Sequence, residues 1–451
     1  MARHFERFVH LVDVAPESVL IGWGGFFLEE RSSGWVVVDD DELGSRREGG
    51  TIGAGSAPYG PAVVEVLDDG GQVVARATTG ERNAVEVQGL RPDTAYGYRV
   101  LVDGEPWAAG ERWDWVLDDD GPGRPRPAGR GYDTRFRTHP SPDASVPLAL
   151  LAFGDYGVGI TNAEAGRRQA AVSRTLEHLA ARHDVRALVS LGDNIYHGDD
   201  DRLEQSGDED DDWYFTFYEP YRYLLDHLPL YPTAGNHDGA DEEANDDRAQ
   251  LADNFHLAAR FGDEGPGLFY RVAIGALLEL VCVDTSAADG RRHFNDALRR
   301  AWLEEALPAG GERGRPWRVP FCHHPAFCAG PHHTGMQEQV DELVPRYVRA
   351  GVPVLLSGHE HNFQTGVAGG LTQVISGAAG KLQEDPPHAS AAADAGTRAW
   401  AAAPHCLLVE VEAEELRITP YGGVAPGQEP VPLEARGPDG AVIDPMVVVR
   451  R

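Results

Sequence analysis

The chain has 451 residues and a formal net charge of −32 at pH 7. This length predicts roughly two or three domains rather than one small module, and a hydrophobic content of 42% excludes wholesale disorder. The acid excess lacks the basic footprint of a nucleic-acid-binding protein, so nucleic acid is not an expected partner.

The sequence carries no sign of a membrane segment or of a disulfide framework. It contains no run of about 18 apolar residues, and its first ten residues lack the apolar stretch of a secretory signal. We therefore expect a protein without membrane contact that stays in the cytoplasm, or an exported protein if this start is a processed form. The four cysteines form no CxxC pair and are expected to be scattered buried thiols.

The first predicted unit is an all-β sandwich over residues 1–138. Apolar patches alternate with polar residues between turn signals such as DGG and DG, a pattern typical of short antiparallel strands. The stretch LRPDTAYGYRVLV places Tyr96 in a tyrosine-corner context and resembles the end of a fibronectin type III or immunoglobulin-like domain. The chain is dense in Pro, Gly and Asp over residues 117–146, and we place a linker at residues 139–146.

The second predicted unit, residues 147–451, alternates buried strands with helices. Apolar runs such as PLALLAFGD and VRALVSLGD indicate strands, and amphipathic stretches at 164–182, 293–306 and 335–349 indicate helices. This alternation predicts a layered α/β core. The segment HCLLVEVEAEELRITPYG indicates a hairpin that completes a sheet.

Five predicted strands of this unit end in loops that carry potential metal ligands. The loops are FGDYG, LGDNIYHGD, AGNHD, FCHHP and SGHEH, and sites in layered α/β folds assemble at the carboxyl ends of strands. Together the loops supply Asp155, Asp193, Tyr196, Asn236, His237, Asp238, His323, His324, His359 and His361. Carboxylate, imidazole, amide and phenolate donors suit iron, zinc or manganese better than a structural thiolate site would. The set is large enough for two metal ions, which a carboxylate such as that of Asp193 can bridge.

The order GDxG, GDxxY, GNH, HxP and GHxH resembles the purple acid phosphatase branch of the calcineurin-like metallophosphoesterases over about residues 147–425. Most of the wider superfamily begins with Asp-x-His, whereas this chain has Asp155-Tyr156-Gly157 and places Tyr196 three residues after Asp193. The stretches GDNIYHGD, AGNHD and GHEHNFQTGV are most similar to the small, tartrate-resistant type, while an added N-terminal β-domain resembles the large plant type. The resemblance implies an α/β (α+β) four-layer β-sandwich flanked by helices and preceded by the all-β sandwich.

The resemblance also implies which residues hold the metals. The first metal, expected to be Fe(III), would be held by Asp155, Asp193, Tyr196 and His361. The second, a divalent Fe, Zn or Mn ion, would be held by Asp193, Asn236, His323 and His359. A phenolate donor favours a trivalent ion, whereas neutral amide and imidazole donors suit a divalent one.

Further histidines are expected beside these ligands. His323 matches the family's ligand because it stands two residues before the proline of the HxP motif, and His324 is expected to be an exposed neighbour. His237, His332 and His333 match positions where the family keeps substrate-contacting histidines, and the sequence leaves open which of His332 and His333 acts. A cationic imidazole there would stabilise the phosphoryl charge and protonate the leaving alkoxide.

The predicted function is hydrolysis of small phosphate monoesters by a metal-bound hydroxide that attacks phosphorus directly, as in an acid phosphatase. One alternative is a phosphodiesterase or nucleotide-hydrolysing enzyme with the same centre, because substrate choice would depend on the insertions 197–230 and 239–268. A second alternative is a non-catalytic binding protein, which the intact ligand positions disfavour. The sequence does not indicate the physiological substrate, the oligomeric state or the role of the N-terminal β-domain.

Overall fold

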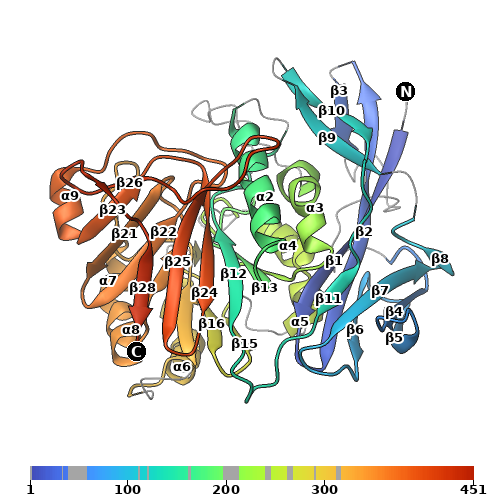
Figure 1. The fold of residues 1–451 in the computed structure, drawn as a ribbon, viewed down its shortest axis with the longest axis horizontal. Coiled ribbons are helices and arrows are strands. Elements are labelled where there is room, and N and C mark those ends of the chain that lie inside the picture. The colour runs from blue at the N-terminus through green and yellow to red at the C-terminus, as the bar shows by residue number, and fades with distance from the viewer. Residues whose placement is uncertain are drawn as a thin grey trace.

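The computed structural model describes most of the 451-residue chain (Figure 1). The described residues are 3–32, 34–38, 58–109, 112–118, 121–160, 164–196, 213–238, 245–261, 268–288, 291–310 and 316–451. Residues 197–212, 239–244 and 262–267 of the two insertions that were predicted to shape the substrate pocket lie outside them. Among the helices of the described ranges, none combines the length and the apolar character that a membrane crossing requires.

The N-terminal segment forms two antiparallel sheets and a hairpin, on the right of Figure 1. One sheet has the order β1-β2-β3 with β6 beside β2, and the other has the order β11-β7-β4-β5 with β8 beside β7. The bounds are β1 Arg3–Val14, β2 Ser18–Arg31, β3 Gly34–Val37, β4 Ala62–Leu67, β5 Val73–Thr79, β6 Ala84–Gln88, β7 Ala95–Val102, β8 Glu105–Pro106 and β11 Arg135–Arg137. β1 and β2 are longer than the short strands we predicted, because they pair along nearly their whole length.

The core of this segment supports the predicted tyrosine corner. Trp23, Val64 and Tyr98 are fully buried within one apolar cluster. The backbone N–H of Arg91 donates a hydrogen bond to Tyr96 Oη over 3.0 Å, which ties the chain to the start of β7. The N-terminal region is therefore an all-β structure with its own apolar core.

Two larger sheets face each other in the rest of the chain. The six-stranded sheet has the order β14-β13-β12-β24-β25-β28, and the nine-stranded sheet has the order β15-β16-β19-β20-β22-β21-β23-β26-β27. β12, β13 and β14 run parallel to one another, and so do β16, β19, β20 and β22. The bounds are β12 Leu148–Phe153, β13 Val185–Ser190, β14 Leu230–Tyr231, β15 Tyr270–Ile274, β16 Leu278–Cys282, β19 Trp317–Phe321, β20 Leu355–Ser357, β21 Phe363–Ala368, β22 Leu371–Ser376, β23 Thr397–Ala401, β24 His405–Val411, β25 Glu415–Gly422, β26 Ala435–Arg436, β27 Val442–Ile443 and β28 Val447–Arg450. β24 and β25 form the predicted hairpin.

Helices cover the outer faces of both sheets and complete four layers. α2, Ala165–Ala180, contacts β24 and β25, whereas α8, Val344–Arg349, contacts β22 of the other sheet. The remaining helical and short segments are η1 Tyr214–Tyr218, α3 Glu219–Leu225, α4 Asn245–Asn254, α5 Leu257–Phe261, the small β17 Ala287–Ala288 and β18 Arg291–Arg292 pair, η2 His293–Asn295, α6 Ala297–Ala306, α7 Gln337–Glu342 and α9 Ala389–Asp394. This arrangement agrees with the predicted four-layer α/β fold.

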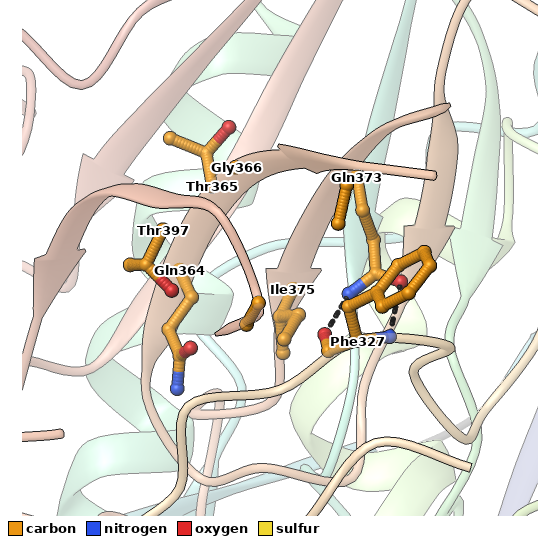
Figure 2. Close-up of a pocket in the computed structure, with 9 residues that line it drawn as sticks. Phe327, Gln364, Thr365, Gly366, Gln373, Ile375 and Thr397 are labelled. Carbon is orange, nitrogen blue, oxygen red and sulfur yellow. Dashed lines mark hydrogen bonds between the residues drawn. The ribbon is translucent and has the colours of Figure 1, made fainter. Parts of the chain in front are cut away.

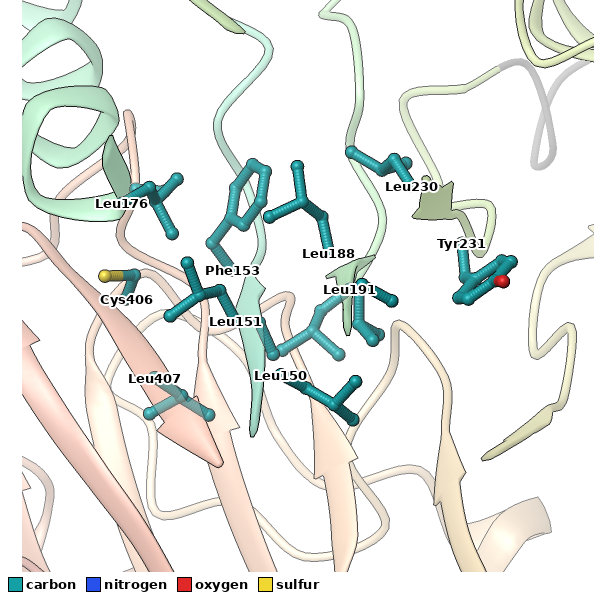
Figure 3. Packing of buried hydrophobic residues seen from close by; sticks show 14 of the residues in the cluster. Leu150, Leu151, Phe153, Leu176, Leu188, Leu191, Leu230, Tyr231, Cys406 and Leu407 are labelled. Carbon is teal, nitrogen blue, oxygen red and sulfur yellow. The ribbon is translucent and has the colours of Figure 1, made fainter. Parts of the chain in front are cut away.

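The main apolar core lies against β12 and β13 (Figure 3). Every residue of these two strands is buried, which explains why their sequences are apolar apart from Arg186 and Ser190 of β13. Leu151 and Phe153 of β12 lie beside Leu188 of β13 and Leu176 of α2 in this core. The strands are thereby held rigidly, and the loops at their carboxyl ends start from fixed positions.

The N-terminal sheets pack tightly on the helices of the second region. Glu6 and Arg222 form an ion pair at 2.9 Å with both side chains fully buried, and Tyr98 Oη donates a hydrogen bond to the carbonyl of Asp226 over 2.7 Å. The Pro- and Gly-rich stretch does not act as a linker before residue 127, because β9, Trp113–Asp118, pairs with β10, Gly121–Pro127. The boundary at residues 139–146 stays a prediction.

Candidate metal centre

The predicted ligand loops meet where the two large sheets face each other. Three of them follow the parallel strands β12, β13 and β14, and two follow β19 and β20 of the other sheet. Because the carboxyl ends of neighbouring parallel strands lie at one edge of a sheet, each sheet presents its loops at a common edge. The result is one cluster made from five separate stretches of sequence.

The backbone of three predicted ligands adopts the left-handed conformation. The φ angles are 57° at Asp155, 50° at Asp193 and 72° at His359, a conformation that costs a non-glycine residue about 1–3 kcal/mol. Backbone hydrogen bonds hold the first two loops together, since the N–H of Asp155 donates to the carbonyl of Gly192 and the N–H of Gly157 donates to the carbonyl of Asp193. A Cβ atom at Gly235 would overlap the Asp193 carboxylate, so the third loop requires glycine there.

The first group of ligands gathers around Asp155. One oxygen of its carboxylate lies 3.5 Å from Nε2 of His361 and 3.5 Å from the hydroxyl of Tyr196. The Tyr196 hydroxyl is also 3.4 Å from His361 Nε2. Ligand atoms of Asp155, Asp193 and His361 lie within 4.8 Å of one another, an arrangement that could hold a metal ion.

The second group gathers around His323, whose ring is fully buried. Its Nδ1 donates a hydrogen bond to the carbonyl of Leu191 over 2.8 Å, which leaves a lone pair on Nε2 of the neutral ring. That lone pair faces Asn236 Oδ1 at 2.9 Å, His359 Nδ1 at 3.1 Å and Asp193 Oδ1 at 3.3 Å. Oxygen and nitrogen electron-pair donors therefore converge on one point, as a divalent cation requires.

Asp193 lies between the two groups and has an unused oxygen. Its Oδ1 accepts a hydrogen bond from the backbone N–H of His237 over 3.0 Å. Its Oδ2 is buried, and within the described ranges no hydrogen bond to it is found. A buried carboxylate oxygen without a donor is costly unless a cation neutralises it, so the residues present fit a pair of bridged metal ions.

Burial governs the ionisation of this cluster. It raises the pKa of Asp155 well above its usual range, and the neighbouring Asp193 carboxylate adds to the effect. Burial and the same carboxylates also raise the pKa of the Tyr196 phenol. The pKa values of His359 and His361 are lowered well below their usual range, again chiefly by burial, so both rings are neutral and able to coordinate.

The three predicted substrate histidines lie at the mouth of the cluster. The rings of His237 and Tyr196 have centroids 4.5 Å apart. The ring of His333 stacks on that of His359 at 3.8 Å, and the ring of His332 lies 5.5 Å from that of His361. Burial, followed by the charge of His332, lowers the pKa of His333 to about 4.

The expectation that His324 is an exposed neighbour is wrong. Its side chain is 5% exposed, and its Nδ1 lies 3.0 Å from the hydroxyl of Thr285. The ring packs 4.5 Å from that of His359, measured between centroids. His324 therefore packs against the predicted ligand His359 inside the protein.

Sequence reasoning missed the polar residues that hold the loop bearing His332 and His333. The carboxylate of Glu360 accepts the backbone N–H groups of both histidines, over 3.3 and 2.6 Å respectively. Phe327 lies earlier in the same loop, and its backbone is held by the side chain of Gln373 on β22. The amide of Gln373 accepts the N–H of Phe327 over 3.2 Å and donates to its carbonyl, beside a small pocket between the loop and the sheet (Figure 2). The glutamate of the GHEH motif was the one available signal, because a charged residue between two ligands is buried only if it has partners.

Asp238, which we counted among the potential ligands, braces the loops instead. It is fully buried and accepts the backbone N–H of Asn194 over 3.0 Å and that of Gly235 over 2.7 Å. Its side-chain oxygen also accepts from the amide of Asn194 over 2.8 Å. These bonds join the loop of Asp193 to the loop of Asn236 and fix their separation.

Two facing sheets thus gather carboxylate and imidazole loops into a cluster that could hold metal ions. The chain carries a calcineurin-like phosphoesterase domain, since residues 148–363 match the model of that family. The family, together with homologues such as the purple acid phosphatase 17 of Arabidopsis thaliana, implies a dinuclear metal centre.

Comparisons with individual proteins agree with this assignment. The chain is 28% identical to the serine/threonine-protein phosphatase CPPED1 of Danio rerio over 169 residues, which cover 36% of this chain and 51% of that protein. It is 26% identical to the tartrate-resistant acid phosphatase type 5 of Oryctolagus cuniculus over 269 residues, which cover 54% of this chain and 77% of that protein. The match to the first of these relatives thus spans about half of its length.

A solved structure extends the likeness of fold over the N-terminal region. The purple acid phosphatase PPD1 from seeds of Lupinus luteus superposes with a TM-score of 0.57 at 13% identity. The superposition covers 99% of this chain and 74% of that one. The all-β region and the four-layer region therefore occur together in that phosphatase fold.

Proposed function

We propose that this protein hydrolyses phosphate monoesters at a dinuclear centre that contains Fe(III) and a divalent Fe, Zn or Mn ion. The observation that carries the proposal is the pair of ligand groups on either side of Asp193, with Tyr196 on one side and Asn236, His323 and His359 on the other. A phenol in one group and neutral donors in the other suit two ions of different charge.

The residues of the chain would divide between holding metal and handling substrate. Asp155, Tyr196 and His361 would hold the trivalent ion, and the remaining ligands would hold the divalent one, with Asp193 shared. When bound, the two ions would supply Lewis-acid activation of water and neutralisation of phosphoryl charge.

The histidines at the mouth of the site would act on the substrate. The exposed His237 and His332 can reach a bound phosphate from solvent, while the stacked His333 offers a neutral hydrogen-bond donor. A histidine near the leaving oxygen would donate the proton that the departing alkoxide needs. Glu360 would keep His332 and His333 close to the ligands, because its carboxylate accepts hydrogen bonds from their backbone N–H groups.

The test compares hydrolysis rates on an aryl phosphate monoester and an aryl phosphate diester for the metal-loaded protein. We expect higher kcat/KM on the monoester. Asp193→Asn and His323→Ala should each abolish turnover, because each removes a donor at the shared or the divalent position. Near-normal turnover in either variant would overturn the ligand assignment. A higher kcat/KM on the diester would contradict the proposed monoesterase activity and favour a phosphodiesterase.

A further inference from the structure

The single lysine of the sequence lies at the candidate metal centre. Of the 40 Lys and Arg residues, only Lys381 is a lysine, in a chain with a net charge of −32. Its Nζ lies 4.6 Å from the centroid of the Tyr196 ring. The ammonium group therefore lies over the Tyr196 side of the site.

The position of Lys381 is built into the fold. It follows β22, which runs parallel to β20, so its loop emerges at the same edge as the loop of His359 and His361. The N–H groups of Gly380 and Lys381 both donate to the carbonyl of Asp155 over 3.0 Å. Two residues later, the N–H of Gln383 donates to the carbonyl of His361 over 2.7 Å. The segment that carries the lysine is thus joined to two ligand loops.

We propose that the ammonium of Lys381 is a specificity-determining contact that binds the substrate phosphate and favours dianionic monoesters over monoanionic diesters. The proposal rests on the proposed function and deepens it. The acid excess of the chain repels anions at long range, and a cation beside the Tyr196 ring opposes that repulsion at the site. Lysine is suited to this task, because its ammonium is a compact point charge on a flexible stem.

The charge on the substrate sets the size of the expected effect. A charge-assisted hydrogen bond contributes enough that its loss changes affinity about tenfold. Since Coulomb energy is proportional to charge, a contact that changes affinity about tenfold for a dianion changes it about threefold for a monoanion. A phosphate monoester is mostly dianionic above its second pKa of about 6, so the difference should appear at pH 7.5.

The experiment measures KM and kcat on both esters at pH 7.5 for metal-loaded Lys381→Gln and Lys381→Arg. We expect Lys381→Gln to raise KM about tenfold for the monoester and about threefold for the diester, with kcat little changed. Lys381→Arg keeps a positive charge, so its KM values should stay close to those of the parent. The matched control is Arg451→Gln, which removes another cation lying 3.9 Å over an aromatic ring, that of Trp317. Trp317 begins β19, at the opposite end from His323, so this control should leave both KM values unchanged.

A binding measurement separates this inference from the function. Titration calorimetry with inorganic phosphate should give a Kd about tenfold higher for Lys381→Gln than for the parent. Equal KM changes on both esters, or unchanged KM and phosphate Kd in a folded Lys381→Gln protein, would overturn the role of Lys381 and leave the phosphoesterase intact. A parent protein that hydrolyses neither ester would overturn the function itself.

Discussion

Two buried histidines at the contact between the N-terminal region and the second region should make the protein sensitive to acid. His10 lies on β1 and His256 immediately precedes α5, and their ring centroids are 5.0 Å apart. Both rings are buried, and among the described residues no hydrogen-bond partner is found for their four nitrogens. The ring of Tyr218 packs 5.7 Å from that of His10. A proton added to either ring would place an unsolvated charge in this contact.

The direction and size of the effect follow from the pKa values. Burial lowers the pKa of His256 from 6.5 to about 4, and burial with the charge of His256 lowers that of His10 well below its usual range. A histidine whose folded pKa is depressed stabilises the fold above its unfolded pKa, and this stability is lost as pH falls through about 6.5 toward the folded value. For His256 alone, the loss amounts to about 2 kcal/mol between pH 7 and pH 5 and about 3 kcal/mol below pH 4.

Urea denaturation at pH 7, 6 and 5 measures this loss directly. In the parent, the free energy of unfolding should fall over this range, although other groups contribute to the slope. His256→Leu removes the titrating ring while keeping the site apolar, so its free energy of unfolding should fall by about 2 kcal/mol less than that of the parent between pH 7 and pH 5. Equal pH dependence in the parent and in both His256→Leu and His10→Leu would refute the reasoning.

Three further predictions concern contacts described above. Arg222→Met should lower the free energy of unfolding by about 3–5 kcal/mol in urea, because it leaves the buried Glu6 carboxylate without its arginine partner; a loss below about 1 kcal/mol would contradict the buried ion pair. Glu360→Ala should lower kcat/KM on a monoester about tenfold with bound metal unchanged, since it releases the backbone N–H groups of His332 and His333. An unaltered kcat/KM would exclude a positioning role for Glu360. Gly235→Ala should reduce the metal content found by elemental analysis, because its Cβ displaces the Asp193 carboxylate, and full metal content would show that the loop tolerates the methyl group.

The centre of the fold and most of the candidate site could be predicted from local sequence. β12 and β13 are buried on both faces, so their residues are mostly apolar, and the Gly-Asp pairs that follow them mark the ligand loops. Because parallel strands bring their carboxyl ends to one edge, chain order alone indicated that five distant loops would meet. The helical stretches predicted at 164–182, 293–306 and 335–349 from the periodicity of their apolar residues contain α2, α6 and the α7–α8 pair.

Contacts between distant residues could not be predicted in the same way. His324 is held in its buried position by Thr285, 39 residues earlier, whose hydroxyl accepts the backbone N–H of His324 and lies 3.0 Å from its ring Nδ1. Nothing near His324 in the sequence shows this contact. The β9–β10 hairpin has the Pro and Gly content of a linker, since composition does not reveal a strand partner. Lys381 was visible as the single lysine, but only the parallel pairing of β20 and β22 connects it to the ligand loops.

The most direct test of the central claim is the metal content of the purified protein together with its visible absorption spectrum, for the parent and for Tyr196→Phe. The account predicts about two metal ions per chain, including iron, and an absorption band that Tyr196→Phe abolishes because the phenolate is the donor of the charge-transfer transition. Two metals without such a band would contradict Fe(III) at Tyr196, and a protein that binds no metal on titration would contradict the dinuclear centre itself.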